Sequence, residues 1–305
     1  MNLKQLKYVI ALADAGSFSK AATILNISQP SLSQYIKKIE EQTGAEFFER
    51  SNGSVRITDA GRVYIDIGRK ILDLEHQMQN SFIDISEHKS GSVIIGTSPF
   101  RSASFMPEIV CEFRKKYPGI CPVVTEMETH DLLEAAQKGE FDICITNLPV
   151  DERVFDYVRV AEEELLVAVR ENNSLDKKLS EVCFKKEKSS LPVIDINHLN
   201  GENFVMLTEN QVMQHILDDM CYDSGVKLNP VVVVKSIEAQ IEMVRMDIGA
   251  ALVPEGIKKI GNKDIRYYRV SYNLPKRQLA AVYPKNKQLS GVVNDFIQTA
   301  KLIKW

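Results

Sequence analysis

The apolar positions of residues 16–43 recur at the spacing of two short helices joined by a tight turn. At about 100° per residue, the second helix places Leu32, Ile36 and Ile39 on one face. The opposite face carries Pro30, Ser33, Gln34 and Lys37. The spacing therefore predicts a helix pair whose second helix turns a polar face outward.

A helix with short polar residues in its N-terminal half suits the major groove of DNA, because Ser, Gln and Lys side chains match the donors and acceptors of base edges. In a helix-turn-helix, this half of the second helix contacts the bases. The alternative is an ordinary helical hairpin with a solvated face. We favour DNA binding, with contacts from Gln29, Pro30, Ser31, Ser33, Gln34 and Lys37.

A β-hairpin is predicted directly after this helix pair. Asn52-Gly53 separates the runs 47–50 and 55–57, and both turn positions tolerate positive φ. Arg50 and Arg56 lie on the two predicted strands. A basic hairpin beside a recognition helix forms a wing, so we expect both arginines to contact phosphates.

The segment 16–61 resembles the N-terminal domain of LysR-type transcriptional regulators. The matching positions form an ordered set: Gly16-Ser17-Phe18-Ser19, Ala21-Ala22, Leu25, Ser28-Gln29-Pro30-Ser31-Leu32-Ser33, Ile36, Ile39-Glu40, Gly44, Phe48, Arg50 and Ile57-Thr58-Asp59-Ala60-Gly61. The resemblance implies a homodimer or homotetramer that binds an interrupted palindrome in double-stranded DNA, bends it and contacts RNA polymerase.

A long helix is predicted from Asp59 to about Glu87, with Thr58 as its cap. Its apolar residues follow a near-heptad spacing: Ala60, Tyr64, Ile67, Ile71, Leu74, Met78, Phe82 and Ile85. So narrow a stripe fits a coiled-coil seam better than a wide globular face. We therefore favour a dimerisation rod over the alternative, a single long core helix.

Beyond Ser90-Gly91-Ser92, predicted strands and helices alternate, which indicates an α/β fold with a mainly parallel sheet. The predicted strands are 93–97, 122–126, 141–146, 164–170, 203–207, 230–234, 250–253, 265–272 and 278–283, and the helices are 103–117, 131–138, 211–223, 237–246 and 290–304. The polar, Lys-rich segment 172–192 is expected to be a solvated surface excursion.

This alternation resembles the regulatory region of the same family, which is similar to periplasmic solute-binding proteins. The resemblance implies a multi-domain chain: an all-α winged helix-turn-helix, a long linker helix and a two-lobe α/β region. The expected bounds are 1–58, 59–90 and 91–305, with lobe one at about 91–161 and 268–305 and lobe two at about 162–267. Asp247 stands where the family often has a glycine, and Asp can adopt the left-handed backbone.

An effector is expected where strands end and helices begin, because free N–H groups and positive dipole ends gather there. The candidates are Ser98, Phe100, Arg101, Ser102, Thr129, Asn147, Thr208 and Asn210. Arg101 could pair a carboxylate bidentately, which favours a small anionic metabolite. The alternative is that these residues are helix caps and that Arg101 is a surface charge.

Charge limits how the N-terminal region could hold DNA. Over residues 1–90, Lys and Arg equal Asp and Glu in number, whereas a nucleic-acid binder usually shows a basic footprint. A single copy would make few phosphate contacts and bind weakly. DNA binding by this chain therefore requires dimerisation.

Composition is that of an ordinary globular chain, with 44% hydrophobic and 26% charged residues. No apolar run is long enough to cross a bilayer, and the chain starts in an amphipathic helix rather than a signal peptide, so we expect a cytoplasmic protein with no membrane partner. The five cysteines have no metal-like spacing and are expected to be reduced, mostly buried thiols. Cys111 and Cys121 are spaced as in peroxide-sensing members of the family, but we expect both to be small core residues.

No HExxH, CxxC, GxGxxG, P-loop or GxSxG pattern occurs, so no catalytic residue, metal or cofactor is assigned. The sequence thus predicts a sequence-specific DNA-binding transcription regulator controlled by a small-molecule effector. The alternative is a cytoplasmic solute-binding or enzymatic α/β protein whose helical N-terminus binds a partner.

Overall fold

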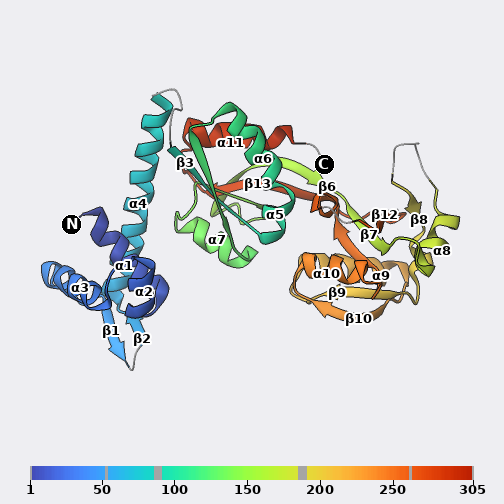
Figure 1. The fold of residues 1–305 in the computed structure, drawn as a ribbon, viewed down its shortest axis with the longest axis horizontal. Helices are drawn as coiled ribbons and strands as arrows, with labels where there is room; N and C mark the ends of the chain where they lie inside the picture. The colour runs from blue at the N-terminus through green and yellow to red at the C-terminus, as the bar shows by residue number, and fades with distance from the viewer. Residues whose placement is uncertain (1, 52–53, 86–90, 185–190, 261–262, 304–305) are drawn as a thin grey trace.

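A computed structural model describes residues 2–51, 54–85, 91–184, 191–260 and 263–303 of the chain. Figure 1 shows three parts in chain order: a small helical unit, the long helix α4, and two α/β lobes side by side. This arrangement confirms the expected fold class, in which a winged helix-turn-helix and a linker helix precede a two-lobe α/β region.

The N-terminal unit, here called the winged domain, packs its helices around one small core. Its elements are α1 (Leu3–Ala15), α2 (Phe18–Ile24), α3 (Gln29–Thr43), β1 (Phe48–Ser51) and β2 (Ser54–Ile57). Ser17 and Ser28 cap α2 and α3, each accepting a backbone N–H three residues later. Asn26 takes a positive φ of 53° at the turn between them. The predicted apolar face of α3 packs against α1 and α2 in this core.

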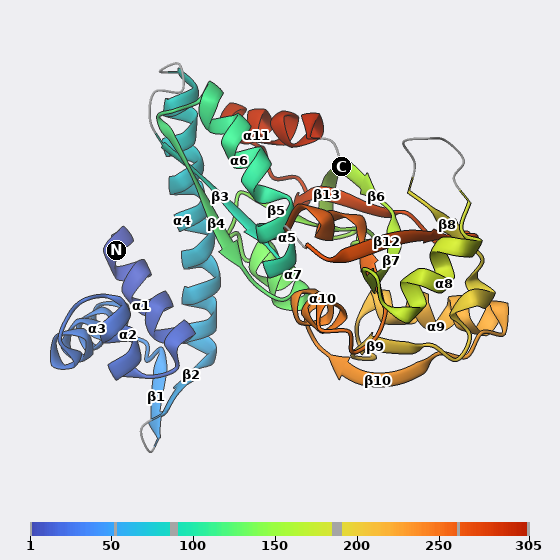
Figure 2. The same ribbon diagram turned by 45° about the vertical axis from the view of Figure 1, so that its right-hand side comes forward.

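Helix α4 (Asp59–Ile85) leads from the winged domain to lobe one. The backbone N–H of Gly61 donates to the Thr58 hydroxyl at 3.0 Å, which confirms Thr58 as the cap. At about 1.5 Å per residue, its 27 residues span roughly 40 Å. Figure 2 shows α4 lying along the side of lobe one, where it contacts β3 and α11.

Lobe one is a five-stranded sheet with helices on both faces. Its strands are β3 (Gly91–Thr97), β4 (Ile120–Glu126), β5 (Ile143–Asn147), β6 (Phe155–Glu163) and β13 (Arg277–Pro284), and its helices are α5 (Pro99–Ser104), α6 (Met106–Lys116), α7 (Thr129–Gln137) and α11 (Gly291–Leu302). The order is β4-β3-β5-β13-β6, in which β3, β4 and β5 are parallel and β13 is antiparallel to both neighbours. Helices α6 and α11 cover one face, and α7 covers the other.

Lobe two is built from two smaller sheets that share a core. Its strands are β7 (Leu165–Arg170), β8 (Val193–Ile194), β9 (Asn203–Leu207), β10 (Asn229–Val234), β11 (Ala251–Pro254) and β12 (Ile265–Val270), and its helices are α8 (Ser174–Val182), η1 (Ile196–Leu199), α9 (Val212–Ser224), α10 (Ile237–Arg245) and η2 (Glu255–Ile260). The strand orders are β11-β7-β12-β8 and β10-β9. A bridge between Phe204 and Ala250 sets β9 beside β11. Asp247 has the expected positive φ, 61°.

The chain crosses between the lobes twice, from β6 to β7 and from β12 to β13, and we call this region the hinge. The chain leaves lobe one at Glu164, between β6 and β7, and returns between Val270 and Arg277. The second crossover thus lies later in the chain than residue 267, because β12 still pairs with β7 and β8.

Three expectations about local structure were wrong. The helix expected at 103–117 is two helices that meet at Phe105, and α5 already begins at Pro99. Part of the expected surface excursion is α8, whose Leu175 and Leu179 are buried in the core of lobe two. Strand β6 was not predicted, because its alternation is interrupted by charged residues on a half-exposed edge strand.

Some expectations fall outside the described residues: the turn Asn52-Gly53, the boundary at Ser90, the segment 185–190 and the ends of the helices expected at Glu87 and Lys304. Among the described residues, no helix is both long and apolar enough to cross a bilayer.

Candidate functional site

The polar face of α3 is presented to solvent as predicted. Gln29, Pro30, Ser31, Gln34 and Lys37 are exposed, and Ser33 is half-buried. Leu32, Ile36 and Ile39 on the other face are at most 2% exposed. The helix is therefore anchored along one side only.

Two of these candidates also have intramolecular partners. The Ser31 hydroxyl lies 2.7 Å from that of Ser28, within the cap of α3. The Lys37 ammonium lies 3.7 Å from Glu41, with both side chains largely exposed. Such an exposed pair is worth little, so Lys37 can exchange this partner for a phosphate at small cost.

The wing is fixed to the helices by backbone contacts that the sequence did not reveal. The Glu40 carboxylate accepts the N–H groups of Phe47 and Phe48 at 2.7 and 3.2 Å. The N–H of Val55 donates to the carbonyl of Gly16 at 3.2 Å. Arg56 is exposed on β2, whereas the side chain of Arg50 on β1 lies outside the described part of the structure. The hairpin is thus held at one end of α1 and α3.

The start of α4 touches the wing so closely that only glycine fits there. A Cβ on Gly61 would lie 2.2 Å from the carbonyl oxygen of Phe47. The Thr58 hydroxyl donates to the carbonyl of Glu46 at 2.6 Å. The start of α4 and the start of the wing are therefore in direct contact.

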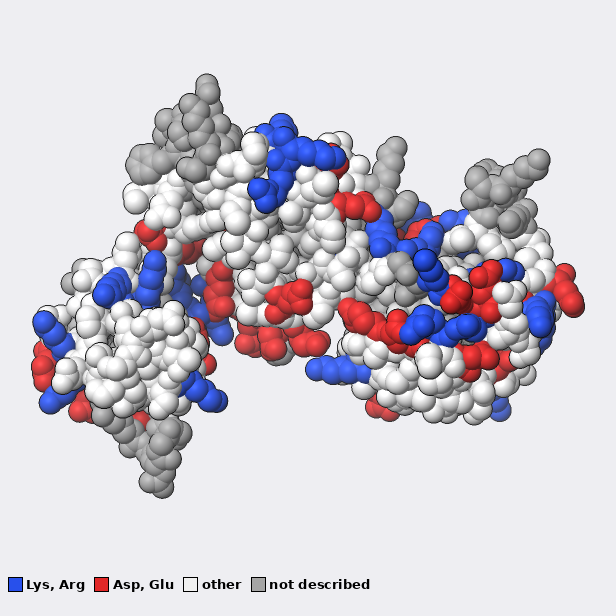
Figure 3. Space-filling view, viewed as in Figure 1, with Lys and Arg blue, Asp and Glu red and all other residues white. Residues whose placement is uncertain are grey.

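The charge of the winged domain is dispersed rather than gathered. On the face seen in Figure 3, its basic side chains are scattered among uncharged and acidic ones. This agrees with the balanced charge of residues 1–90. Few phosphate contacts per copy mean weak binding by one copy.

One side of α4 exposes apolar side chains in a row. Val63, Ile67, Leu74 and Met78 are 60%, 52%, 62% and 54% exposed. Near the winged domain, this row borders an apolar groove of about 430 Å³, lined among others by Leu6, Phe47, Val63, Tyr64, Ile67 and Ile71. The side chains of Phe82 and Ile85 are not described. Of the predicted seam, Ala60, Ile67, Leu74 and Met78 are thus exposed in a single chain, whereas Tyr64 and Ile71 are half-buried.

Three of the eight predicted effector residues, Ser98, Thr208 and Asn210, have their side chains engaged in a helix cap or a turn. Ser98 caps α5, and its hydroxyl accepts the N–H of Arg101 at 3.4 Å. The Thr208 hydroxyl donates to Asn210 at 2.7 Å. Ser102 is half-buried in α5, and Thr129 is exposed at the start of α7. These residues do not gather around one described cavity, and their effector role stays a prediction.

Phe100 and Arg101 are placed differently from what the sequence suggested. Phe100 is 6% exposed and inserts into a core cluster of lobe two, so α5 joins the lobes. Arg101 is 1% exposed, which makes the surface-charge alternative wrong. Its guanidinium pairs with Glu163 and donates to Asn147 at 3.0 Å. An effector carboxylate would therefore have to compete with Glu163 for Arg101.

Arg277, which no sequence pattern indicated, is the second arginine of this buried group. Its guanidinium lies 3.5 Å from Glu163 and 3.1 Å from the Met213 sulfur of lobe two. Burial, and then the nearby positive charge of Arg101, lower the pKa of Arg277 to about 10, against the opposing effect of Glu163. Arg277 is therefore still charged at neutral pH. Two positive charges thus share one carboxylate, and the hinge interior carries a positive excess.

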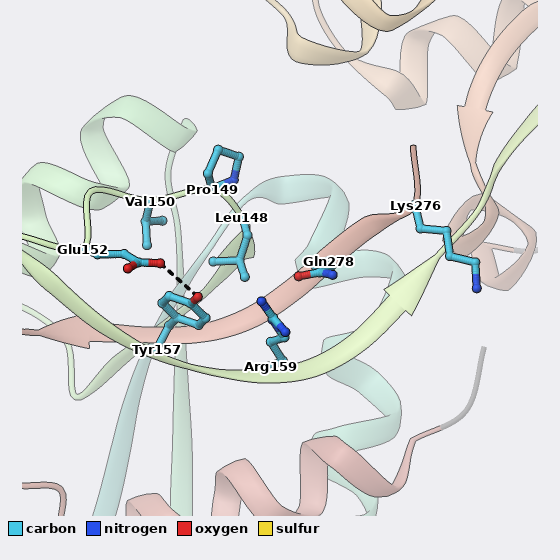
Figure 4. A pocket seen from close by; sticks show the side chains of 8 residues that line it. All are labelled: Leu148, Pro149, Val150, Glu152, Tyr157, Arg159, Lys276 and Gln278. Atoms are coloured by element: carbon cyan, nitrogen blue, oxygen red, sulfur yellow. Dashed lines mark hydrogen bonds between the residues drawn. The ribbon is translucent and has the colours of Figure 1, made fainter. Parts of the chain in front are cut away.

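A separate open pocket of about 340 Å³ lies on the other face of the hinge strands (Figure 4). Arg159, Lys276 and Gln278 line it, beside an apolar wall that includes Leu148 and Pro149. Gln278 follows Arg277 on β13, so the two side chains point to opposite faces of the sheet. Lys276 is exposed and 3.5 Å from Glu162. The outer edge of lobe one around α7 is acidic in Figure 3.

The cysteines are less buried than expected. Cys111 and Cys121 are both exposed, so their assignment as core residues was wrong, and only Cys144 is fully buried. Burial raises the pKa of the Cys144 thiol far above its ordinary value, which leaves it protonated. In the part of the chain that the structure describes, no three His, Cys, Asp or Glu side chains are grouped so that they could hold a metal ion.

Two family models together cover most of the chain. The model for "Bacterial regulatory helix-turn-helix protein, lysR family" matches residues 3–62. The model for "LysR substrate binding domain" matches residues 86–302. The gap between the two matches lies in α4, the helix that also separates the winged domain from lobe one in the structure.

Individual relatives align over nearly the whole length. The uncharacterized HTH-type transcriptional regulator YcgK of Bacillus subtilis is 26% identical, over 99% of this chain and 94% of the relative. The hydrogen peroxide-inducible genes activator of Haemophilus influenzae is 28% identical, over 93% of this chain and 90% of the relative.

Solved structures share the fold at lower identity. Full-length CbnR complexed with its target DNA superposes with a TM-score of 0.68 at 20% identity, over 99% of both chains. A full-length OxyR variant from Pseudomonas aeruginosa gives a TM-score of 0.69 at 20% identity, over 100% of this chain and 99% of that one. At these identities the likeness shows the fold.

Proposed function

This chain belongs to the LysR family and is a DNA-binding transcription regulator modulated by a small-molecule effector, and we propose that α3 and the β1–β2 wing are its DNA-contacting elements. One observation carries this proposal: α3 exposes its polar face while its apolar face is fully buried. Such a helix has a free side that fits the major groove, with a hairpin placed beside it for the backbone.

The contacts divide into two kinds. Ser33 and Gln34 carry neutral donors and acceptors and are proposed to contact base edges. Lys37, Arg50 and Arg56 are proposed to contact phosphates, which fixes position without specifying sequence. The start of α3 is proposed to lie against the major groove of the DNA, through Gln29, Pro30 and Ser31.

We expect Gln34→Ala to change the sequence preference of DNA binding and Lys37→Ala to change only its overall affinity. Loss of a base contact by Gln34→Ala should cost about 1–3 kcal/mol on the preferred operator and relax base preference at one position. Lys37→Ala should weaken binding to all sequences alike. It should also reduce, by about one, the slope of the logarithm of the binding constant against the logarithm of the salt concentration. Gel-shift titrations with the DNA upstream of its own gene, against a scrambled duplex at several salt concentrations, measure both.

Lys7→Ala is the control, because Lys7 is exposed on α1 and outside the proposed contacts. It should leave both affinities unchanged. Retention of full sequence preference by Gln34→Ala would show that the base-contacting residues were assigned wrongly.

The regulator acts as a homo-oligomer, and we propose that the exposed row on α4 is its dimer seam. A second copy would cover Val63, Ile67, Leu74 and Met78, which are otherwise left in water. Two winged domains joined in this way can bind two half-sites of a palindrome.

We propose an anionic effector whose carboxylate is held near Arg277 at the hinge. The positive excess of Arg101, Arg277 and Glu163 supports this, since a buried charge without compensation is costly. Met213 of lobe two lies against Arg277, so an anion there would touch both lobes. Ligand binding could then shift their packing, provided that it prefers one arrangement.

Thermal-shift measurements on the full chain with acetate, succinate and benzoate test the effector proposal. A ligand at a hundred times its dissociation constant stabilises by about 2.7 kcal/mol. We expect at least one carboxylate to raise the melting temperature of the wild type, and Arg277→Gln to abolish that rise.

Arg159→Gln is the matched control, because Arg159 lines the open pocket on the other face of the hinge strands. It should leave the carboxylate effect intact. If Arg159→Gln removes the effect and Arg277→Gln does not, the anion sits in the open pocket and the assignment to Arg277 is wrong.

Regulators of this family are generally not enzymes, and we propose that this chain catalyses no reaction. We also propose that it acts in the cytoplasm, where its operator DNA is, and contacts RNA polymerase from the bound operator. Loss of transcriptional control by α3 variants, with unchanged stability, would support that role.

A further inference from the structure

Helix α4 has a second functional face, opposite the exposed apolar row. Arg69, Asp73 and His76 follow one another at steps of four and three, which places them on one side of the helix. At about 100° per residue, Arg69 lies roughly 160° round the helix from Ile67. All three side chains face charged groups on lobe one or the winged domain.

Arg69 joins three parts of the chain. Its guanidinium, 12% exposed, pairs with Asp14 of α1 in the winged domain and with Glu140 of lobe one. Asp14 and Glu140 are far apart in sequence, and both pair with this side chain. Arg69 therefore links the DNA-binding unit, the linker helix and the regulatory region.

Asp73 and His76 extend the contact along lobe one. Lys287 donates to Asp73 at 2.8 Å and to the carbonyl of Phe141 at 3.0 Å, and its side chain is 6% exposed. The ring Nδ1 of His76 lies 3.2 Å from Asp142. The Asp142 carboxylate also accepts the N–H of Ile94 at 2.8 Å, which ties it to β3. Asp142 is therefore tied to the sheet of lobe one, and Lys287 lies in the turn that follows β13.

We propose that Arg69, Asp73 and His76 form a clasp that holds α4 on lobe one and so passes the state of the regulatory region to the winged domain. The clasp is partly buried, which distinguishes it from surface ion pairs that contribute little. Figure 2 shows α4 against lobe one and away from lobe two. The winged domain, α4 and lobe one would then move together, as one unit, when lobe one shifts relative to lobe two.

His76 makes this clasp sensitive to pH. The groups that face it are Asp142, Lys287, Ser92 and, from its own helix, Asp73. The hydrogen bond with Asp142 is the largest cause that raises the pKa of His76 above 6.5, against the effect of burial. A raised pKa means that the stabilisation is fully present below pH 6.5 and is lost as pH rises through the raised value.

Hydrogen exchange of the full-length chain tests the clasp. We expect Arg69→Gln, Asp73→Asn and Lys287→Met to speed exchange about tenfold in the peptides that cover residues 69–76 and 139–143, since each substitution removes an ion pair that holds α4 on lobe one. Exchange in α2 and α3 should not change. Lys70→Gln is the matched control, because Lys70 is exposed on α4 and about 100° round the helix from Arg69.

Two further readouts separate a transmitting clasp from a merely structural contact. In the wild type, exchange of residues 69–76, corrected for its intrinsic pH dependence, should quicken as pH rises above 6.5 through the raised pKa of His76, and His76→Gln should remove this dependence. The bend of the bound upstream DNA, measured with permuted fragments, should shift in Arg69→Gln. Unchanged exchange in all three variants would overturn the clasp, and faster exchange with an unchanged DNA bend would overturn its role in transmission.

Discussion

Replacing Glu163 by Gln is expected to lower the free energy of unfolding of the regulatory region by about 3–5 kcal/mol. Glu163 is 2% exposed and is the carboxylate that Arg101 and Arg277 share. The substitution preserves shape but leaves two buried guanidinium groups without a counter-charge. Urea denaturation of the full chain, followed by circular dichroism, measures the loss.

Glu162→Gln is the control for this prediction. Glu162 is the neighbouring residue, but its side chain is exposed and 3.5 Å from the exposed Lys276. Its replacement should change stability by no more than about 0.5 kcal/mol. An equal effect of both substitutions would show that the hinge interior does not depend on Glu163 as a counter-charge.

Replacing Ile67 by Glu is expected to separate the dimer and to weaken operator binding by about 10²–10⁴-fold. Ile67 is half-exposed in the single chain, at 52%, so the substitution should barely affect the protomer's own fold. A carboxylate at the centre of an apolar seam would be buried against its own copy. Without the seam, the second half-site is no longer bound at the high effective concentration that joining two modules provides.

Analytical ultracentrifugation and gel shifts on the same preparation measure this effect. Gln79→Glu places the same charge at an exposed position about 120° round α4 from Ile67, and it should leave both the dimer and DNA binding intact. A dimer that persists in Ile67→Glu would contradict the proposed seam.

The helix-turn-helix could be predicted because it depends on residues close together in the chain. Leu32, Ile36 and Ile39 define a buried face by spacing alone, and Ser28 caps a helix that starts one residue later. The long helix α4 and most strands followed from the same periodicity. Strand β6 did not, because an edge strand at a hinge keeps charged residues on both faces and loses the alternation.

In the effector region, the contacts join residues that are far apart in the chain, and local sequence patterns did not predict them. The sequence marked Arg101 as a charged residue near a helix start, but its partner Glu163 lies 62 residues later. No motif or spacing in the sequence around Arg277 indicated that it would be near a binding site. Phe100 looked like part of a ligand-binding loop, yet it fills a core cluster of the other lobe.

The sequence by itself determined the order of the domains, the exposed polar face of α3 and the apolar row along α4. Periodicity reports which side of an element is apolar, because that depends only on the geometry of one helix or strand. The tertiary structure alone decided what each side meets: Glu163 for the hinge arginines, and Glu140, Lys287 and Asp142 for the far side of α4. Charge pairs of this kind join distant segments, so the path of the chain in space determines them and no local pattern records them.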